Sequence, residues 1–325
     1  MAVCYRSDWP EVGLLAALSD RPYGRSKTSV PDNTDWVRAT EIPEGGIRWV
    51  ASQAELETNL YGFPIWNLHL EVTSTLPFNI SSIQDFVVQT TRQLLETSPW
   101  GTAYVCSKLI EGEPLYFALR EVGFEEIERR RIYRCKMRDI PDGSISFQDT
   151  HIQFVSLADI GSEHLSDYRE QILDVCREAF EEEGHSRYFV DVILTEQQPG
   201  LTYILAMMKL NFSRLALENF LIAIDTRHNY VCGFTVYGKK HGFVGDLYTQ
   251  LLSAVRKAYR SQEIYRRLTY LLSQILSPKA TLLNVTHTNN HAIQRAYHRS
   301  GRKHLVDTVV LRRFYNNESC KKNTT

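Results

Sequence analysis

With 325 residues, the chain is long enough for two domains of ordinary size. Hydrophobic residues make up 43% and charged residues 23%, which is the balance of a chain that buries a core. The chain has 37 Lys and Arg against 38 Asp and Glu, so its net charge is −1. A nucleic-acid or anionic-membrane partner normally requires a basic excess, so we expect no nucleic acid and no membrane as partner.

The apolar segments are too short for export or for membrane insertion. The run 13–18 is shorter than a signal core and is flanked by Asp8, Glu11 and Asp20. No stretch of the sequence approaches the roughly 20 apolar residues that span a bilayer. The six cysteines lack Cys-x-x-Cys spacing, which is typical of buried thiols and not of metal ligands. The ten histidines are scattered, which also argues against a metal site. We therefore expect a cytoplasmic protein without a metal cofactor.

Hydrophobic patterns in the first half predict a small globular unit that begins near Ile47. Its predicted elements are strands at 63–72, 103–106 and 129–137 and helices at 82–96 and 115–122. The Pro-Asp-Gly-Ser sequence at 141–144 is strong turn chemistry and the best candidate boundary. The sequence thus predicts a first domain at 1–140 and a second domain at 141–325.

The second half alternates helices and strands more clearly. A helix at 167–183 has an apolar face that includes Ile172, Val175, Cys176 and Phe180. The further predicted elements are a helix that follows Pro199 and runs through 217, a hairpin of 220–224 and 230–237, a strand at 247–255, a helix at 263–276, a strand at 281–285, a helix at 290–300 and strands through 314. This order predicts a mixed α/β (α+β) layer fold.

The segment 255–268 has the pattern of a strand end, a short polar turn and a helix start. Such a turn gathers unpaired backbone N–H groups at the positive end of a helix dipole, which suits a diphosphate. Arg260 would add charge-assisted hydrogen bonds to phosphate oxygens. Every turn from a strand to a helix shares this geometry, so the segment alone is a weak signal.

A second segment, 288–301, contains the predicted helix at 290–300, which has two polar residues of interest. Asn290 stands at the helix start, where its side chain is a good N-cap. Tyr297 lies two turns later, and by itself it fits a core aromatic with its hydroxyl at the rim. Each residue taken alone therefore has a structural explanation.

In order and spacing, the two segments together resemble the Gcn5-related N-acetyltransferases (GNATs). In that family the diphosphate loop reads Arg/Gln-x-x-Gly-x-Gly/Ala and follows a strand that ends in Val-x-Pro-x-Tyr-Arg. Val255, Tyr259 and Arg260 match this strand end. The later family helix reads Asn-x-x-Ala-x-x-x-Tyr-x-x-x-Gly-Phe. The residues that keep its spacing here are Asn290, Tyr297 and Gly301.

A narrower resemblance is to the sugar-nucleotide members typified by dTDP-fucosamine acetyltransferase. Those proteins carry a motif like Arg-Tyr/Phe-His-x-Asp-Pro, against Ser-Arg-Tyr-Phe-Val-Asp at 186–191. Their loop tends to read Gly-Ile-Tyr-Arg, against Glu-Ile-Tyr-Arg at 263–266. Their N-terminal half is an incomplete acetyltransferase domain, which 56–65 and 115–124 resemble. The resemblance covers most of 47–315 and implies the GNAT fold in two GNAT-like halves, the first of them degenerate.

The resemblance implies acetyl-CoA as co-substrate and assigns its binding site to the second half. The implied donor-binding residues are Ala254, Val255, Arg260, Ser261, Gln262, Glu263, Ile264, Tyr265 and Asn290. Backbone N–H groups near Ala254 and Val255 would bind the oxyanion that develops during acyl transfer. Tyr297 would be the catalytic acid that protonates the leaving thiolate.

The acceptor implied by the resemblance is a small-molecule amine, with a nucleotide-linked amino sugar as the narrower option. The attacking amine must be neutral, so a base or a water chain must take its proton. His185, Glu181 and Asp191 lie in the segment that should face the acceptor, and the choice among them stays open. A homodimer is kept as one option for the assembly.

Three residues depart from the family pattern. Glu263 and Ser261 stand where the family loop usually has Gly, and Arg302 stands where it has Phe, which predicts a lost packing residue. A carboxylate about 4 Å from a phosphate costs about 1 kcal/mol in water and about 4 kcal/mol at an intermediate dielectric. If Glu263 instead points outward from the helix start, it stabilises the helix.

Two alternatives follow from these departures. The first is a non-catalytic GNAT-like protein that binds or regulates a partner and has a degenerate CoA loop. The second is a duplicated acetyltransferase-like fold that takes aminoacyl groups from tRNA, against which the absent basic excess argues.

Overall fold

The computed structural model describes residues 36–37, 47–72, 84–85, 88–89, 92, 102–111, 114–141, 151–181, 184–240, 246–260 and 262–316. The chain forms two compact units. One unit comprises Met1–Arg129 with Asp307–Thr325, and the other comprises Arg130–Val306. The division falls within two strands, β5 (Glu125–Lys136) and β11 (Lys303–Asn316).

The first unit is built on strands and two short helices. Its strands are β1 (Trp36–Val37), β2 (Ile47–Gln53), β3 (Ile65–Val72), β4 (Thr102–Ile110) and the later part of β11, and its helices are α2 (Glu55–Tyr61) and α4 (Pro114–Glu121). β1 pairs with β2, β2 with β3 and β4 with β11 in antiparallel fashion, whereas β3 and β4 are parallel. Helix α2 ends at Gly62, whose φ of 75° lies in the left-handed region that favours glycine.

The second unit is built on a mixed sheet. Its strands are β6 (Ile152–Ser156), β7 (Phe220–Asp225), β8 (Tyr230–Lys239), β9 (Leu247–Val255), β10 (Thr281–His287), the end of β5 and the start of β11, in the order β11-β5-β10-β9-β8-β7-β6. Among the pairs from β5 to β6, only the β9–β10 pair is parallel. The helices are α5 (Leu165–Phe180), α6 (Arg187–Val190), α7 (Val192–Thr195), α8 (Gly200–Arg214), α9 (Ile264–Ile275) and α10 (His291–Arg299). The 3₁₀ turns are η1 (Met137–Asp139), η2 (Leu157–Asp159), η3 (Leu217–Asn219) and η4 (Lys257–Tyr259).

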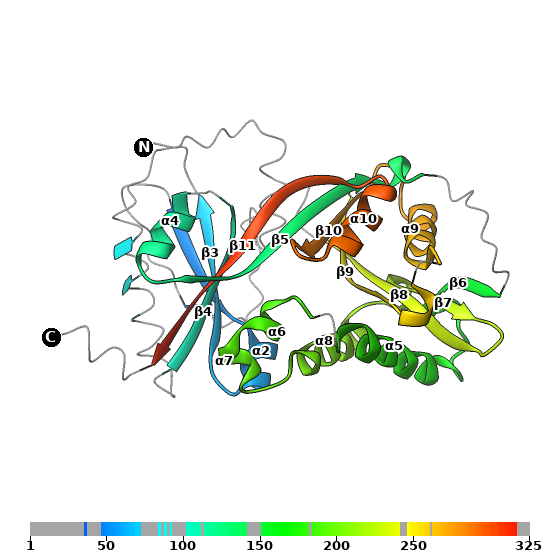
Figure 1. Ribbon diagram of the computed structural model, residues 1–325, viewed down its shortest axis with the longest axis horizontal. Coiled ribbons are helices and arrows are strands. Elements are labelled where there is room, and N and C mark those ends of the chain that lie inside the picture. The colour runs from blue at the N-terminus through cyan, green and yellow to red at the C-terminus, as the bar shows by residue number, and fades with distance from the viewer. Residues whose placement is uncertain are drawn as a thin grey trace. The chain divides into compact units, whose positions relative to one another are not determined.

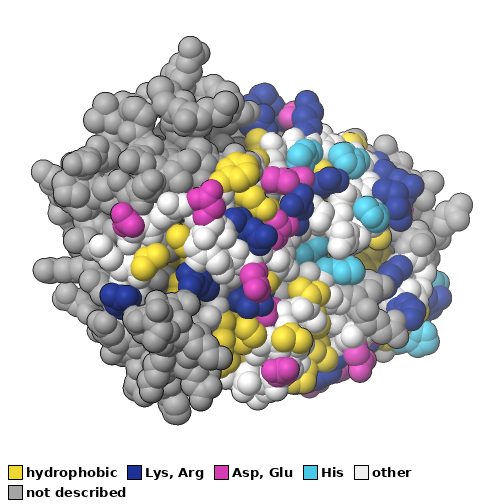
Figure 2. All heavy atoms as spheres, turned by 60° about the vertical axis from the view of Figure 1, so that its left-hand side comes forward, with side chains coloured by type: hydrophobic (Ala, Val, Ile, Leu, Met, Phe, Trp, Pro, Cys, Tyr) yellow, Lys and Arg dark blue, Asp and Glu magenta, His cyan; other side chains and the backbone are white. Residues whose placement is uncertain are grey.

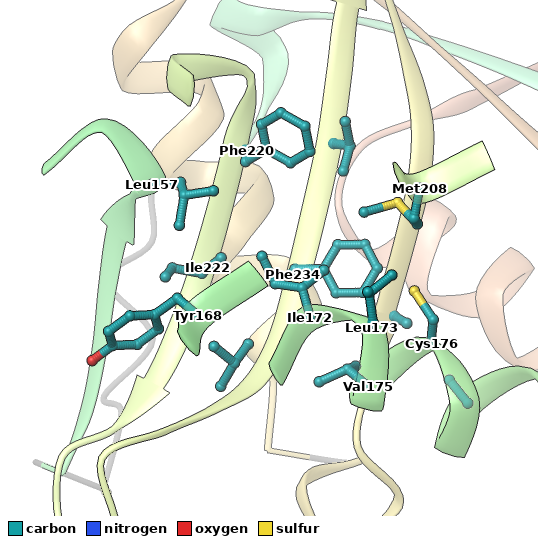
Figure 3. Packing of buried hydrophobic residues seen from close by; sticks show 14 of the residues in the cluster. Leu157, Tyr168, Ile172, Leu173, Val175, Cys176, Met208, Phe220, Ile222 and Phe234 are labelled. Atoms are coloured by element: carbon teal, nitrogen blue, oxygen red, sulfur yellow. The ribbon is translucent and has the colours of Figure 1, made fainter. Parts of the chain in front are cut away.

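Helices cover both faces of the sheet in the second unit (Figure 1). Helices α5 and α8 pack on one face through a cluster that includes Ile172, Met208 and Phe234, as the close-up in Figure 3 shows. Helix α9 packs on the opposite face, where Leu268 and Leu272 contact a second cluster of buried residues. The sheet is therefore the middle layer of a three-layer unit, which explains why every residue of β7 is buried.

Charged side chains are mixed on the exposed surface. Figure 2 shows basic and acidic side chains interspersed over the face that it draws, in agreement with the balanced composition. On that face, no extended area of one sign stands out among the described residues.

The structure confirms most of the predicted elements of the second half. β9 has the predicted bounds, and α9 and α10 begin within one residue of the predicted positions. β6 was not expected, although it pairs along its whole length with β7. The predicted helix at 82–96 lies largely outside the described residues. The boundaries between the compact units lie at Arg129 and Val306 and not near 140, because β11 pairs with β4. The two predicted domains, 1–140 and 141–325, stay a prediction.

We expect Ile222→Ala to lower the free energy of unfolding by about 2–5 kcal/mol, because Ile222 is fully buried in the sheet and its removal leaves a cavity. Urea unfolding followed by circular dichroism measures the change. Ile275→Ala is the matched control at the exposed end of α9, where the side chain is 47% exposed, and it should change stability by no more than about 0.5 kcal/mol. Equal losses at both positions would contradict the assignment of the core.

Candidate functional site

The parallel strands β9 and β10 separate soon after they meet. They pair only at three positions, from Leu247 opposite Thr281 to Thr249 opposite Leu283. Yet β9 continues to Val255, and β10 continues to His287 while paired with β5 on its other side. Within the described residues, the edge of β9 that faces β10 therefore has no ladder partner after Thr249.

A β-bulge lies where the strands separate. Leu252 pairs with Val236 of β8, but Tyr237 pairs with Gln250, so Leu251 has no opposite residue. The Leu251 side chain is 39% exposed. A bulge locally increases the twist of a strand, and bulges are common beside functional sites because they redirect side chains.

The hydrogen bonds to β8 show which backbone groups of β9 face the open edge. The N–H of Arg256 donates to the carbonyl of Cys232 at 2.8 Å, and Val255 lies opposite Gly233. Because directions alternate along a strand, the N–H groups of Ser253 and Val255 point away from β8, whereas that of Ala254 points toward it. The carbonyl of Val255 accepts a hydrogen bond from Nε of Arg260 at 3.4 Å.

The start of α9 leaves backbone donors available. Arg267 is the first residue whose N–H bonds inside the helix, to the carbonyl of Glu263 at 3.0 Å. No side chain caps this helix. The N–H groups of Ile264, Tyr265 and Arg266 therefore form the unsatisfied first turn that can bind an anion. By contrast, Asn290 caps α10, since its Oδ1 accepts from the N–H of Ile293 at 3.1 Å.

Glu263 adopts a left-handed backbone conformation, which favours glycine. Its φ of 57° and ψ of 13° lie in the left-handed region, which costs a non-glycine residue about 1–2 kcal/mol. Its carboxylate lies 3.6 Å from the guanidinium of Arg266 on the next turn of the helix. The negative charge at this position is therefore offset by a neighbouring cation.

Two carboxylates hold the turn between β9 and α9. Asp225 is fully buried and accepts hydrogen bonds from Oη of Tyr259 at 2.6 Å and from Nη2 of Arg227 at 2.9 Å. The Arg227 hydrogen bond holds the pKa of Asp225 well below its usual range, with help from Tyr259 and against the effect of burial. Glu178 of α5 accepts from the N–H of Lys257 at 2.6 Å and forms an ion pair with Arg256 at 2.9 Å.

A buried chain of polar groups runs under the separated strands. Tyr297 of α10 is 5% exposed and donates a hydrogen bond to the hydroxyl of Tyr265. Tyr265 donates in turn to Oε1 of Gln250 at 2.8 Å, beside the bulge. Asn284 of β10 donates to the same Gln250 oxygen and to the Tyr297 hydroxyl. The chain thus connects α10, α9, β9 and β10 at the point where the two strands separate.

Burial raises the pKa of Tyr297 well above its usual value, and the neighbouring Tyr265 adds to this rise. The positive charge of Arg302 and the hydrogen bond from Asn284 oppose it. The Tyr297 ring also meets Tyr133 edge to face, with centroids 5.1 Å apart. These contacts hold the phenol in one orientation, and its raised pKa keeps it protonated at neutral pH.

The expectation that Arg302 is a lost packing residue is wrong. Arg302 is only 2% exposed, and its guanidinium donates to Oδ1 of Asn284 at 2.7 Å, to Oγ1 of Thr269 at 3.1 Å and to Oγ of Ser300. The side chain fills the position through hydrogen bonds that a phenylalanine cannot form. The preceding Gly301 is required there, because its φ is 78° and a Cβ atom would lie 2.9 Å from the carbonyl oxygen of Asp139.

The structure brings together the predicted residues from the end of β9 to the first turn of α9. These are Val255, Arg260, Gln262, Glu263, Ile264 and Tyr265, and the hydrogen bond to Tyr265 joins Tyr297 to them. Ser261 lies outside the described residues. The sequence analysis missed Gln250 and Asn284, each of which is the one amide side chain of its strand.

The candidate bases lie in different surroundings. The ring of His185 lies 6.2 Å from that of His287 at the end of β10, measured between centroids. Asp191 is buried and caps α7, with its Oδ1 accepting from Ile193 at 3.1 Å. Glu181 follows the last residue of α5. Of the three, His185 is therefore the one beside the strand that leaves β9.

No protein-family model matches the chain, and no curated protein matches its sequence. Among solved structures, a GCN5-related N-acetyltransferase from Sphaerobacter thermophilus is similar with a TM-score of 0.53, at 12% identity over 82% of this chain and 76% of that one. A tandem GNAT protein from the clavulanic acid biosynthesis pathway has a TM-score of 0.52, at 10% identity over 78% of this chain and 76% of that one. This chain has the GNAT fold.

A third similar structure is the glucosamine N-acetyltransferase region of a fungal multi-domain GH3 β-N-acetylglucosaminidase, with a TM-score of 0.53 and 10% identity over 96% of this chain and 38% of that one. At such low sequence identity, the similarity of these structures shows the fold alone. It confirms the predicted mixed-sheet GNAT fold. The tandem GNAT protein agrees with two GNAT-like halves. The dTDP-fucosamine type and a degenerate first half stay predictions. In the described residues, no helix is long and apolar enough to cross a membrane, and no three His, Cys, Asp or Glu residues gather as a metal site.

We expect Asp225→Asn to destabilise the protein at neutral pH and to have a somewhat smaller effect near pH 3, where the loss of this stability has only begun. A carboxyl group whose folded pKa is depressed adds stability above its unfolded pKa of about 3.9, and that stability is lost as the pH falls through the folded pKa. Urea midpoints at pH 7 and pH 3 measure the difference. Asp246→Asn is the control, because Asp246 is part of an exposed ion pair with Lys239; an equal pH dependence there would contradict the role of Asp225.

Proposed function

We propose that this protein is an acyl-CoA-dependent N-acetyltransferase that transfers an acetyl group to a primary amine of a small molecule. The observation that carries the proposal is the separation of β9 from β10 directly beside a tyrosine whose hydroxyl is linked to the uncapped helix α9. This arrangement offers an open strand edge, an anion site and a proton donor within one compact unit.

The anion site suits the diphosphate of acetyl-CoA. The N–H groups of Ile264, Tyr265 and Arg266 and the positive end of α9 would bind its oxygens. Arg260 precedes them in the turn and would add a guanidinium. The extended pantetheine arm would then lie along β9, where Val255 and Ser253 direct polar backbone groups to the open edge.

The same open edge would stabilise the reaction. When the amine attacks the thioester carbonyl, negative charge develops on its oxygen, and a fixed backbone N–H lowers the energy of that charge. The geometry favours Val255 over Ala254 for this role, because the N–H of Ala254 points toward β8. We assign the second open-edge donor to Ser253.

Tyr297 would complete the transfer. As the C–S bond breaks, its electron pair passes to sulfur, and the Tyr297 hydroxyl gives its proton to form the free thiol of CoA. The amine loses a proton to a base, and the phenolate regains one, so the reaction is balanced. Because burial keeps the phenol protonated, the acid is present in the required form at neutral pH.

The acceptor amine is proposed to bind beside the gap between β9 and β10, on the side that β10 forms. Leu251 and Val285, both more than a third exposed, occupy positions that would face each other if the β9–β10 ladder continued by two residues. His185 and His287 follow beside them, and His185 is our candidate for the base. Since one similar structure is named a glucosamine N-acetyltransferase region, amino sugars, free and nucleotide-linked, are the first acceptors to test.

The competing function is a non-catalytic GNAT-like protein that binds a ligand or a partner. Glu263 is the observation that favours it, because a carboxylate stands at the start of α9. Its ion pair with Arg266 weakens this argument. Transfer from tRNA has less support still, since Figure 2 shows both charge signs interspersed and not a basic surface on the face that it draws.

We expect isothermal titration to show micromolar binding of acetyl-CoA to the wild type and binding to Glu263→Gly that is tighter by less than about tenfold. The change should be modest because Arg266 already offsets the carboxylate. Arg260→Ala should weaken binding by about tenfold or more, since a guanidinium that contacts phosphate is lost.

Asn229→Gly is the matched control for the backbone, because Asn229 is another described non-glycine residue with positive φ and lies in the β7–β8 turn. Its affinity for acetyl-CoA should equal that of the wild type. Binding to Glu263→Gly but not to the wild type would favour the non-catalytic function. Failure of both to bind would refute the acyl-CoA function.

We expect Tyr297→Phe to lower kcat by about 10²-fold or more while the Kd of acetyl-CoA is unchanged, because the ring is kept and only the acid is lost. Release of free CoA, detected with a thiol reagent, measures the rate with the first amine acceptor that is found. Tyr237→Phe is the control, since Tyr237 is equally buried but donates to the carbonyl of Glu218. Full activity of Tyr297→Phe would remove Tyr297 from the mechanism.

A further inference from the structure

A buried cation lies against both tyrosines of the polar chain. The guanidinium carbon of Arg302 is 5.0 Å from the ring centroid of Tyr297 and 5.4 Å from that of Tyr265. The two tyrosine rings are themselves 5.9 Å apart. One charge therefore contacts both phenols at distances where the attraction between a cation and an aromatic ring is significant.

The charge of Arg302 is held by neutral groups alone in the described part of the chain. The side chain donates to Asn284, Thr269 and Ser300, whose oxygens carry no net charge. Neutral acceptors satisfy the hydrogen bonds of a guanidinium but do not cancel its charge, so its field reaches the neighbouring rings in a medium of low dielectric. A buried charge without a counterion is costly, so a partner anion that forms during function would recover part of that cost.

The hydrogen bonds indicate that this partner anion would be the phenolate of Tyr297. Tyr297 donates to Tyr265, which donates to Gln250 at 2.8 Å. When Tyr297 loses its proton, Tyr265 and Asn284 both remain able to donate to the phenolate, because Asn284 already donates to that oxygen. The phenolate would thus form between two donors and beside the cation.

We propose that Arg302 is a positioning residue that makes Tyr297 and Tyr265 a coupled acid, by stabilising the phenolate that remains after Tyr297 protonates the leaving thiolate. The inference rests on the proposed acetyltransferase function. It explains the presence of an arginine where the resemblance calls for phenylalanine. The proton balance is unchanged: Tyr297 gives one proton to sulfur and recovers one from the proton that the acceptor amine releases.

The other ionisable groups near the pair do not supply this stabilisation. Cys135 of β5 interacts with Tyr265 and can only become negative. Tyr133 of β5 packs against Tyr297 and is in turn in contact with the rings of His298 and His304. Among the described residues, Arg302 is the only Lys or Arg side chain found against either tyrosine ring. Its charge lowers the pKa of both phenols, against the larger effect of burial.

The test is a pH titration of the protein labelled with 3-fluorotyrosine and followed by ¹⁹F NMR, with Tyr297→Phe and Tyr265→Phe assigning the two resonances. In Arg302→Met the first ionisation of the pair should move upward by about 1 pH unit or more, since an opposite charge at close range is lost. Arg302→Lys keeps the charge and should shift it less. Tyr237, whose pKa burial raises to about 12 without contact to Arg302, is the internal control and should not move.

The variants also separate charge from structure. Arg302→Gln is neutral but can still donate to Asn284, so it replaces Arg302→Met in the comparison if the latter does not fold. With an acceptor amine, the neutral variants should lose about tenfold in kcat and move the alkaline limb of the pH profile upward, because the acid is weaker and keeps its proton to higher pH.

The proposal would be overturned if the first ionisation occurred at the same pH in the wild type and in both neutral variants. It would also be overturned if Arg302→Lys shifted this ionisation as far as Arg302→Met does. The titration needs no ligand, so it decides the effect of Arg302 by itself. Calorimetry of acetyl-CoA on the same samples decides the proposed function separately.

Discussion

The fold depends on how the sheet tolerates an interrupted hydrogen-bond ladder at its centre. Polar backbone groups in a covered sheet are normally paired, since leaving one buried without a partner costs about as much as a lost hydrogen bond. β9 and β10 nevertheless separate after three paired positions. The carbonyl of Val255 accepts a hydrogen bond from Arg260, whereas the N–H groups of Ser253 and Val255 face the open edge. In the proposed function, an extended ligand with amide groups would bind along this edge.

The turn beyond β9 combines acidic residues with the site proposed for a diphosphate, and ion pairs between neighbouring residues make the two compatible. Asp225, Glu178 and Glu263 all lie at or beside this turn, and each has an arginine within 2.9, 2.9 and 3.6 Å respectively. Asp225 and Glu178 also bind the turn itself, through Tyr259 and the N–H of Lys257. The carboxylates therefore fix the shape of the turn, while the arginines limit the repulsion that they would exert on phosphate.

Periodicity and turn chemistry were sufficient to predict β9, α9 and α10, and the two helices are strongly amphipathic. The orientation of Glu263 was not predictable, since it follows from a left-handed backbone conformation that a glutamate rarely adopts. Arg302 was misread because its partners come from Thr269, Asn284 and Ser300, which are distant or unremarkable in sequence. Local patterns predict elements, whereas a buried polar network depends on which elements meet.

The network around Arg302 also explains why packing and chemistry are hard to separate at this position. A phenylalanine would fill the volume but would leave the oxygens of Asn284 and Thr269 without a donor, and each buried unsatisfied group costs about 1–3 kcal/mol. Asn284 in turn orients Gln250 and Tyr297. A loss of hydrogen bonds at Arg302 would therefore loosen Tyr297, the proposed acid, even if the charge of Arg302 had no effect. Charge and position reach Tyr297 through the same side chain, so only a readout of ionisation distinguishes the two.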